Sequence, residues 1–265
     1  MRCAIILRVV LFITPYRMTT PIDIREEAGV RYLHFGSQWI QGAMRIARPW
    51  NLELEYIREM MTALLLRDAP RKVLMIGLGA ASLTKFIYRH YPLAHLTVVE
   101  IEPAVVAAAR QFFKLPQDDK RINMVIGDGV EFVQACTKKF DLILVDGYNK
   151  EGRSGALAMS AFYLSCRARL SAEGILSANL LSRNRGFKIT AARIAEAFDD
   201  RALVLPSSES GNAIALAAAG NLIELTFDDL KENALDLKEK TGLNLLPTLA
   251  RLAQAQTCLN DTLIL

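Results

Sequence analysis

The hydrophobic pattern of the chain changes near Pro70, where an extended and helical start gives way to a regular alternation. Residues 20–48 have the pattern of β-structure, and Gly36–Ser37 separates two extended runs by a residue pair suited to a tight hairpin. Residues 52–66, "LELEYIREMMTALLL", have the spacing of one amphipathic helix. We therefore expect a small β-hairpin region and a helix ahead of the main fold.

Short apolar runs and helical stripes alternate after Pro70. The runs are typical of strands buried in a parallel sheet; they are "KVLMIG", "LTVVE", "INMVIGD", "FDLILVD" and "GILSANL". Helical spacing occupies 83–91, 105–113, 131–138 and 189–198, and "RALVLP" with "NAIALAAAG" is suited to a closing antiparallel pair. This order predicts an α/β fold with a doubly wound, mostly parallel, seven-stranded Rossmann-like sheet.

Composition narrows the class of protein. With 265 residues and 52% hydrophobic content, the chain can bury a large core as one domain with an appendage. The net charge is only +4, and no Lys/Arg cluster has interleaved aromatic residues, so we expect no nucleic-acid partner. No segment reaches membrane-spanning length, so we expect no membrane partner. The cysteines are far apart and lack metal-ligand spacing, which predicts reduced thiols, no metal and a cytoplasmic location.

Candidate chemistry lies where the predicted strands end, because ligands of open α/β sheets bind at the carboxyl ends of the strands. The first strand ends at Gly77 and Gly79, whose backbone can approach a ligand closely. Glu100, twenty-three residues after Gly77, can accept hydrogen bonds from a ribose diol. Asp128–Gly129 could place a carboxylate against a purine amine, although Asp128 could equally be a helix N-cap.

Together with Asp146 at the end of the fourth strand, these acids predict a nucleoside site. A dinucleotide fits less well, because Ser82 replaces the third fingerprint glycine and no second mononucleotide-binding half follows. One nucleoside is the better prediction.

Four segments follow from these patterns. Residues 1–19 begin with an apolar run like that of a secretory signal, but Arg8 interrupts it and no small-residue cleavage site follows. We expect this segment to be a poorly ordered or strand-like extension. Residues 20–50 form the N-terminal β-hairpin region, residues 51–220 the nucleoside-binding catalytic domain, and residues 221–265 a helical tail.

Several motifs between about Val30 and Ala219 resemble the spermidine synthase (polyamine aminopropyltransferase) family, within the class I S-adenosylmethionine-dependent methyltransferase fold. They are "WIQ", "VEIEPAVV", "RINMVIGDG" and "FDLILVD". The resemblance implies that Gln41 and Glu100 bind the cofactor nucleoside, that Asp128 meets the adenine, and that Asp146 deprotonates the attacking amine. It also implies an oligomer, and we expect a homodimer to which residues 20–48 contribute, because an isolated hairpin is only marginally stable.

The sequence departs from the family pattern at three places. Ala80 stands where the glycine loop of the family has an Asp that would face the ammonium of decarboxylated S-adenosylmethionine. Ile57–Arg58 replaces a Tyr-His pair, and "GYNK" after Asp146 replaces Ser/Thr-x-Asp-Pro. The nearby loops also carry basic residues, namely Lys150, Arg153, Arg183 and Arg185.

These departures slightly favour methyl transfer from S-adenosylmethionine to a small-molecule acceptor that is less cationic than putrescine. One alternative is aminopropyl transfer from decarboxylated S-adenosylmethionine to putrescine. The other is a non-catalytic relative that keeps only the nucleoside pocket.

Overall fold

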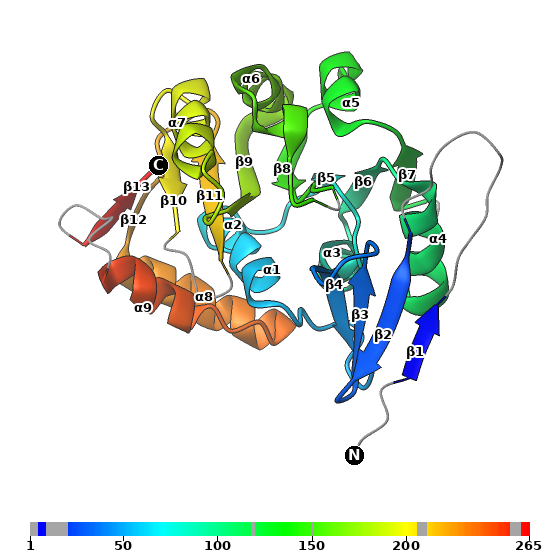
Figure 1. Cartoon of the computed structure of the whole chain (residues 1–265). Coiled ribbons are helices and arrows are strands. Elements are labelled where there is room, and N and C mark those ends of the chain that lie inside the picture. Colours follow the sequence, from blue (N-terminus) through cyan, green and yellow to red (C-terminus); the bar gives the residue numbers. More distant parts are fainter. Residues whose placement is uncertain (1–4, 9–20, 118–119, 150, 206–210, 255–260) are drawn as a thin grey trace.

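The computed structural model describes residues 5–8, 21–117, 120–149, 151–205, 211–254 and 261–265 (Figure 1). Its centre is a seven-stranded sheet in the order β10-β11-β9-β8-β5-β6-β7. The strands are β5 (Lys72–Ile76), β6 (His95–Glu100), β7 (Ile122–Ile126), β8 (Phe140–Val145), β9 (Leu170–Leu181), β10 (Ala202–Val204) and β11 (Asn212–Ala218). β9, β11 and β10 pair antiparallel, whereas β9, β8, β5, β6 and β7 pair parallel. The predicted α/β fold with a seven-stranded, mostly parallel sheet is confirmed.

Helices cover both faces of this sheet (Figure 1). One face packs on α5 (Gly129–Ala135), α6 (Ser160–Arg169) and α7 (Phe187–Ala197). The other packs on α1 (Glu55–Met60), α2 (Ala63–Leu66), α3 (Ser82–His90), α4 (Pro103–Phe112), α8 (Phe227–Thr241) and α9 (Leu246–Gln254). Each face of the sheet has its own hydrophobic core, and alternate residues of β5 point into the two cores. Val73 and Met75 belong to the core under α1 to α4, α8 and α9, and Leu74 and Ile76 belong to the core under α5 to α7.

The N-terminal region is a four-stranded antiparallel sheet beside the main domain (Figure 1). Its strands are β1 (Ile5–Arg8), β2 (Asp23–Glu27), β3 (Val30–His34) and β4 (Ile40–Arg45). Of the extension at 1–19, the structure describes only β1, which pairs with β2; the rest lies outside the described residues.

The prediction of a tight turn at Gly36–Ser37 is wrong. The two-residue turn lies instead between β2 and β3 at Ala28–Gly29, where both residues have positive φ. His34 pairs with Ile40 after a register shift, so the connection around Gly36 is five residues long. This longer connection contributes Phe35, Gln38 and Trp39 to the wall of a cavity at the carboxyl ends of the central strands.

The single helix predicted over 52–66 is divided into α1 and α2. Met60 and Met61, at the junction, are both fully buried, so the apolar stripe continues although the helix does not. The hydroxyl of Ser177 in β9 donates to the carbonyl of Met60 over 2.9 Å. This bond satisfies a backbone acceptor that the break in the helix leaves open.

The C-terminal tail, predicted only to be helical, contains the helices α8 and α9 and a pair of strands, β12 (Glu224–Thr226) and β13 (Thr262–Ile264). Thr226 and Asp229 form a capping box at the start of α8, and Gly242 ends that helix in a left-handed conformation. Among the described helices, none is long and apolar enough to cross a membrane.

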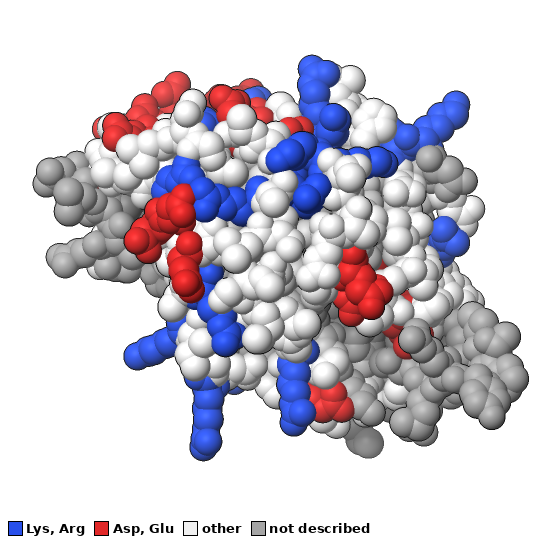
Figure 2. Space-filling model, turned by 90° about the horizontal axis from the view of Figure 1, so that it is seen from above, with Lys and Arg blue, Asp and Glu red and all other residues white. Residues whose placement is uncertain are grey.

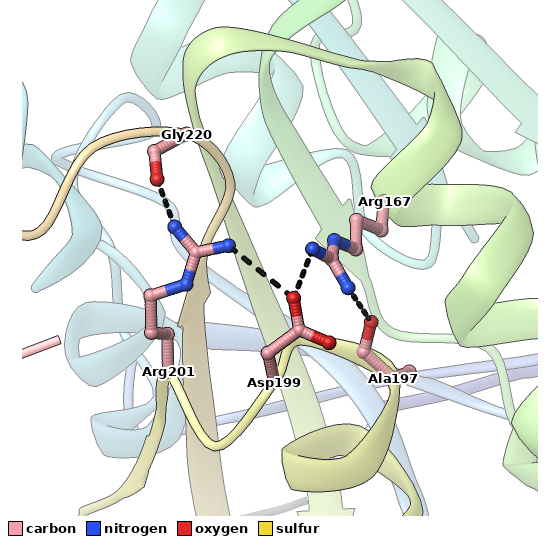
Figure 3. Close-up of polar contacts among 5 residues, drawn as sticks. All are labelled: Arg167, Ala197, Asp199, Arg201 and Gly220. Carbon is pink, nitrogen blue, oxygen red and sulfur yellow. Dashed lines mark hydrogen bonds and ion pairs between the residues drawn. The ribbon is translucent and has the colours of Figure 1, made fainter.

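A cluster of polar contacts joins α6, the end of α7 and the loop after β11 (Figure 3). Arg167 forms an ion pair with Asp199 and donates to the carbonyl of Ala197, while Arg201 contacts Asp199 at 3.9 Å and the carbonyl of Gly220. The hydrogen bond from Arg167 lowers the pKa of the Asp199 carboxyl. Because Asp199 is largely exposed, these pairs fix local geometry more than they add stability.

Charges of both signs are interspersed on the face that carries α5, α6 and α7 (Figure 2). Lys and Arg side chains alternate there with groups of Asp and Glu instead of forming one basic surface. The absence of a nucleic-acid partner stays a prediction.

Lys85 on α3 is buried in the core, with 1% of its surface exposed. Its Nζ donates to the carbonyl of Phe113, just after α4, over 2.8 Å. Burial lowers the pKa of Lys85 to about 7. The side chain therefore joins two helices through one hydrogen bond in an apolar setting.

The ends of β5 and β8 lie side by side because Gly77 has no side chain. Its φ is +93°, and a Cβ built there would lie 2.2 Å from the carbonyl oxygen of Asp146. We expect Gly77→Ala to lower the free energy of unfolding by about 2–4 kcal/mol, through strain and overpacking. Urea unfolding measures this loss.

Gly127→Ala is the matched control, since Gly127 also follows a strand and its Cβ would meet nothing within 4 Å. Equal stability of the two variants would contradict this account of the strand ends.

Candidate active site

A cavity of about 760 Å³, called here the central cavity, lies at the carboxyl ends of β5, β6, β7 and β8. The connection between β3 and β4 supplies another part of its wall. All the site residues predicted from the sequence line it: Gln41, Gly77, Gly79, Glu100, Asp128, Gly129 and Asp146. The structure thus brings together residues that are spread over more than a hundred positions of the chain.

Glu100, at the end of β6, holds the glycine loop in place. Its Oε2 accepts from the backbone N–H of Leu78 and its Oε1 from that of Glu102, both over 2.9 Å. The residue is only 7% exposed, and this burial raises the pKa of the carboxyl while the backbone hydrogen bonds oppose the rise. A carboxylate oxygen can accept more than one hydrogen bond, so these contacts leave capacity for a ligand hydroxyl.

Asp128 caps helix α5, as one of the two interpretations of the sequence proposed. Its Oδ1 accepts from the backbone N–H groups of Val130 and Glu131, over 2.7 and 3.2 Å. The same side chain lines the central cavity. Capping and contact with a ligand are therefore compatible, and the cap fixes the direction of the carboxylate.

The N-terminal sheet is seated directly on the glycine loop. A Cβ on Gly42 of β4 would lie 2.6 Å from the Cβ of Ala80, and one on Gly79 would lie 2.9 Å from the carbonyl oxygen of Gln41. This close approach places Gln41 beside the loop that follows β5.

Ala80 is 3% exposed and is not part of the cavity wall. Its methyl group packs towards Gly42, and the next residue, Ala81, turns the chain into α3 with a left-handed φ of 57°. The preference for S-adenosylmethionine over its decarboxylated form, inferred from Ala80, assumed that this side chain faces the cofactor. The structure gives that assumption no support.

Asp146 lies just beyond β8 and is held by two side-chain hydrogen bonds. Tyr56 donates to Oδ2 over 3.2 Å, and the amide of Asn179 donates to Oδ1 over 2.8 Å. Burial raises the pKa of Asp146, whereas these two bonds lower it. Burial and the charge of Asp146 raise the pKa of Tyr56, so this phenol stays protonated and can donate.

Sequence reasoning missed Tyr56 and Asn179. Tyr56 is inconspicuous because it belongs to the apolar stripe of a predicted helix. Asn179 did offer a signal, since it is a polar residue near the carboxyl end of the buried run "GILSANL". The hydroxyl of Tyr148 donates to the backbone carbonyl of Asn179 over 2.6 Å and so helps to fix the residue that holds Asp146.

Acidic side chains outnumber basic ones among the described residues of the cavity wall. The wall has four carboxylates, from Glu55, Glu100, Asp128 and Asp146, against the guanidinium groups of Arg153 and Arg183. Arg185 does not line the cavity, and Lys150 lies outside the described residues. The basic mouth inferred from the sequence is therefore not the character of the described wall.

No set of three or more His, Cys, Asp or Glu residues in the described part of the chain is arranged to hold a metal ion. Cys136 and Cys166 are free thiols.

Comparison of the sequence with known proteins identifies its family. The spermine/spermidine synthase domain matches residues 54–183. Over 246 residues the chain is 35% identical to the polyamine aminopropyltransferase of Neisseria meningitidis serogroup A, covering 90% of this chain and 94% of the relative. It is 34% identical over 233 residues to the enzyme of the same name from Chromobacterium violaceum, covering 88% and 89%.

Solved structures share the fold. A spermidine synthase in complex with the transition-state analogue AdoDATO superposes with a TM-score of 0.68 and 24% identity, covering 89% of this chain and 83% of that one. Human methyltransferase-like protein 13 in complex with SAH gives a TM-score of 0.64 and 24% identity, covering 72% and 93%. Since the match to the bacterial relatives runs along nearly the whole sequence, the chain belongs to the spermidine synthase (polyamine aminopropyltransferase) family.

Proposed function

We propose that this protein is a polyamine aminopropyltransferase, which transfers the aminopropyl group of decarboxylated S-adenosylmethionine to an amine of a diamine such as putrescine. The surplus of carboxylates in the described wall of the central cavity carries the proposal. Both substrates are cationic, and a cationic ligand gains from a cavity of opposite charge. Relatives that match nearly the whole chain bear the same activity in their names.

Methyl transfer, which the sequence slightly favoured, is not supported. The methyltransferase among the structural neighbours is 24% identical, which shows a common fold alone. The departure at position 80 does not decide the reaction, because the side chain of Ala80 packs towards Gly42 and is not part of the cavity wall. Aminopropyl transfer, the alternative, is the better supported reaction.

The nucleoside end of the donor would lie against Glu100, Asp128 and Gln41. Glu100 would accept from the ribose hydroxyls, and Asp128 would meet the adenine amine. Gly77, Gly79 and Gly129 would let the backbone approach the ligand closely. Support comes from the position of all these residues in the wall of one cavity.

Asp146 would hold and deprotonate the acceptor amine. The amine nitrogen attacks the aminopropyl carbon bonded to sulfur, the carbon–sulfur bond breaks, and its electron pair neutralises the sulfonium to a thioether. The nitrogen, now cationic, gives its proton to the Asp146 carboxylate. Asn179 and Tyr56 would keep that carboxylate in place by their hydrogen bonds.

A homodimer and a cytoplasmic location remain predictions that belong to this proposal. The N-terminal sheet exposes large apolar side chains at Trp39, Ile40 and Ile46. Such side chains would suit a contact between two copies of the chain.

Donor preference tests the proposal. Decarboxylated S-adenosylmethionine should bind at least about tenfold more tightly than S-adenosylmethionine, because the carboxylate of the latter adds a like charge to an acidic cavity. Calorimetric titration gives both affinities, and incubation with putrescine followed by mass spectrometry identifies the product.

Equal affinity for the two donors, together with methylated products, would restore the methyl-transfer hypothesis. Binding of the thioether 5′-methylthioadenosine without turnover of either donor would point to a non-catalytic relative.

Asp146→Asn should reduce kcat by about 10²–10⁴-fold, because the amide cannot accept the proton of the amine. Affinity for 5′-methylthioadenosine should stay unchanged, since the proposed partner of Asp146 is the acceptor. In the unmodified protein, kcat should fall in acid at a higher pH than an ordinary aspartate would give, because burial raises the pKa of Asp146 and the carboxylate must be ionised. Steady-state kinetics across pH measures both effects.

Asp141→Asn is the matched control. Asp141 lies near the start of β8 and accepts from the backbone N–H groups of Arg71 and Lys72 over 2.9 Å, away from the cavity. If it lowered kcat as much as Asp146→Asn, a catalytic role for Asp146 would be untenable.

A further inference from the structure

Helix α1 separates two cavities. On one side, Glu55 and Tyr56 line the central cavity. On the other, a second cavity of about 360 Å³ lies between α1, α3 and the C-terminal tail, and Glu55, Arg58 and Glu59 line it. Glu55 borders both cavities. Because cavities flank α1, side-chain packing alone supports it on only part of its circumference.

One residue of the tail holds the outer side of α1. Arg251 of α9 donates from Nη1 to Oε1 of Glu55 over 3.3 Å, and its Nη2 forms an ion pair with Glu59. Glu55 and Glu59 are one helical turn apart, so they project from the same side of α1. The planar fork of an arginine can reach two carboxylates at once, whereas a lysine presents a single point charge.

The ion pair with Glu59 compensates a buried charge. Glu59 is 1% exposed, and a buried carboxylate is costly unless a cation compensates it. α9 is anchored in turn by Leu249 and Leu252, which are buried in the core. The position of α1 is thus tied to a segment almost two hundred residues later in the chain.

The inner side of α1 reaches the proposed base. The hydroxyl of Tyr56 donates to the carboxylate of Asp146. Tyr56 directly follows Glu55, the residue to which Arg251 donates. Apart from this clamp, α1 is fixed by Ile57 and Met60 in the core and by the bond from Ser177 to Met60. A helix of six residues has little stability of its own, so these tertiary contacts decide where Tyr56 lies.

We propose that Arg251 is a positioning residue for the reaction: by clamping Glu55 and Glu59, it keeps α1 where the hydroxyl of Tyr56 meets the carboxylate of Asp146. The inference rests on the proposed function in one respect, since it takes Asp146 as the base. The C-terminal tail is then part of the catalytic apparatus although none of its described residues lines the central cavity.

The groups that face Asp146 define a readout. They are Tyr56 from α1, Asn179 from β9 and Tyr148 from the loop after β8. Loss of the Tyr56 bond removes a contact that favours the ionised carboxyl, so the pKa of Asp146 rises. A purely structural role of Arg251 would lower thermal stability and leave this titration unchanged.

The test compares Arg251→Lys with Tyr56→Phe. Arg251→Lys keeps a cation for Glu59 but loses the fork, whereas Arg251→Gln, a second variant, leaves Glu59 uncompensated. Carbon-13 NMR of proteins labelled at the aspartate carboxyls follows the titration of Asp146, which Asp146→Asn assigns. We expect the titration midpoint to rise in both Arg251 variants and in Tyr56→Phe, and kcat to fall roughly two- to thirtyfold in Arg251→Lys.

Lys240→Gln is the matched control, because Lys240 of α8 also pairs with the main domain, at Asp68 over 3.4 Å, but does not contact α1. It should leave both the titration and kcat unchanged.

An unaltered Asp146 titration in Arg251→Lys would overturn the proposal, whether or not Tyr56→Phe shifts it. An equal shift in Lys240→Gln would overturn it as well, because the effect would then be general to the tail. The NMR readout needs no substrate. Failure of the unmodified protein to use putrescine would therefore count against the proposed function alone.

Discussion

The close approach of backbone segments at the carboxyl edge of the central sheet determines the rest of the site. Gly77 lets the chain after β5 lie against the carbonyl of Asp146, and Gly42 lets β4 rest on Ala80. A single Cβ at either place would collide with its neighbour. With a side chain at Gly42 the N-terminal sheet could not rest on the glycine loop, and with one at Gly77 the ends of β5 and β8 could not lie side by side.

The carboxylates of the cavity have structural partners before any ligand arrives. Glu100 joins the loop after β5 to the loop after β6, Asp128 caps α5, and Asp146 is held by Tyr56 and Asn179. Each side chain therefore has a fixed direction in the absence of a substrate. Such preorganisation limits the rearrangement required when the donor and acceptor bind. Structural and functional interpretations of these acids are complementary.

Local patterns were sufficient for the strands of the central sheet and for the convergence of Glu100, Asp128 and Asp146, but they missed α6 and the strand pair β12–β13. Periodicity identifies the buried strands and most of the helices, and the geometry of parallel sheets brings the strand ends together. The same patterns could not show that Tyr56 meets Asp146 or that Arg251 reaches α1, because those contacts depend on packing between distant segments. They also misplaced the tight turn, since Gly36 suits a hairpin as well as Gly29 does, and they did not show which way Ala80 points.

The buried amine of Lys85 makes folding sensitive to proton concentration. Its pKa is about 7 in the folded protein against an ordinary 10.5, so between these values the unfolded chain binds a proton that the folded chain lacks. Mass action then favours the folded state as hydroxide increases, and the contribution of Lys85 to stability rises from pH 7 towards 10.5. Near neutrality the buried amine therefore lowers the free energy of unfolding by nearly its largest amount. The same side chain makes the hydrogen bond that joins α3 to the end of α4.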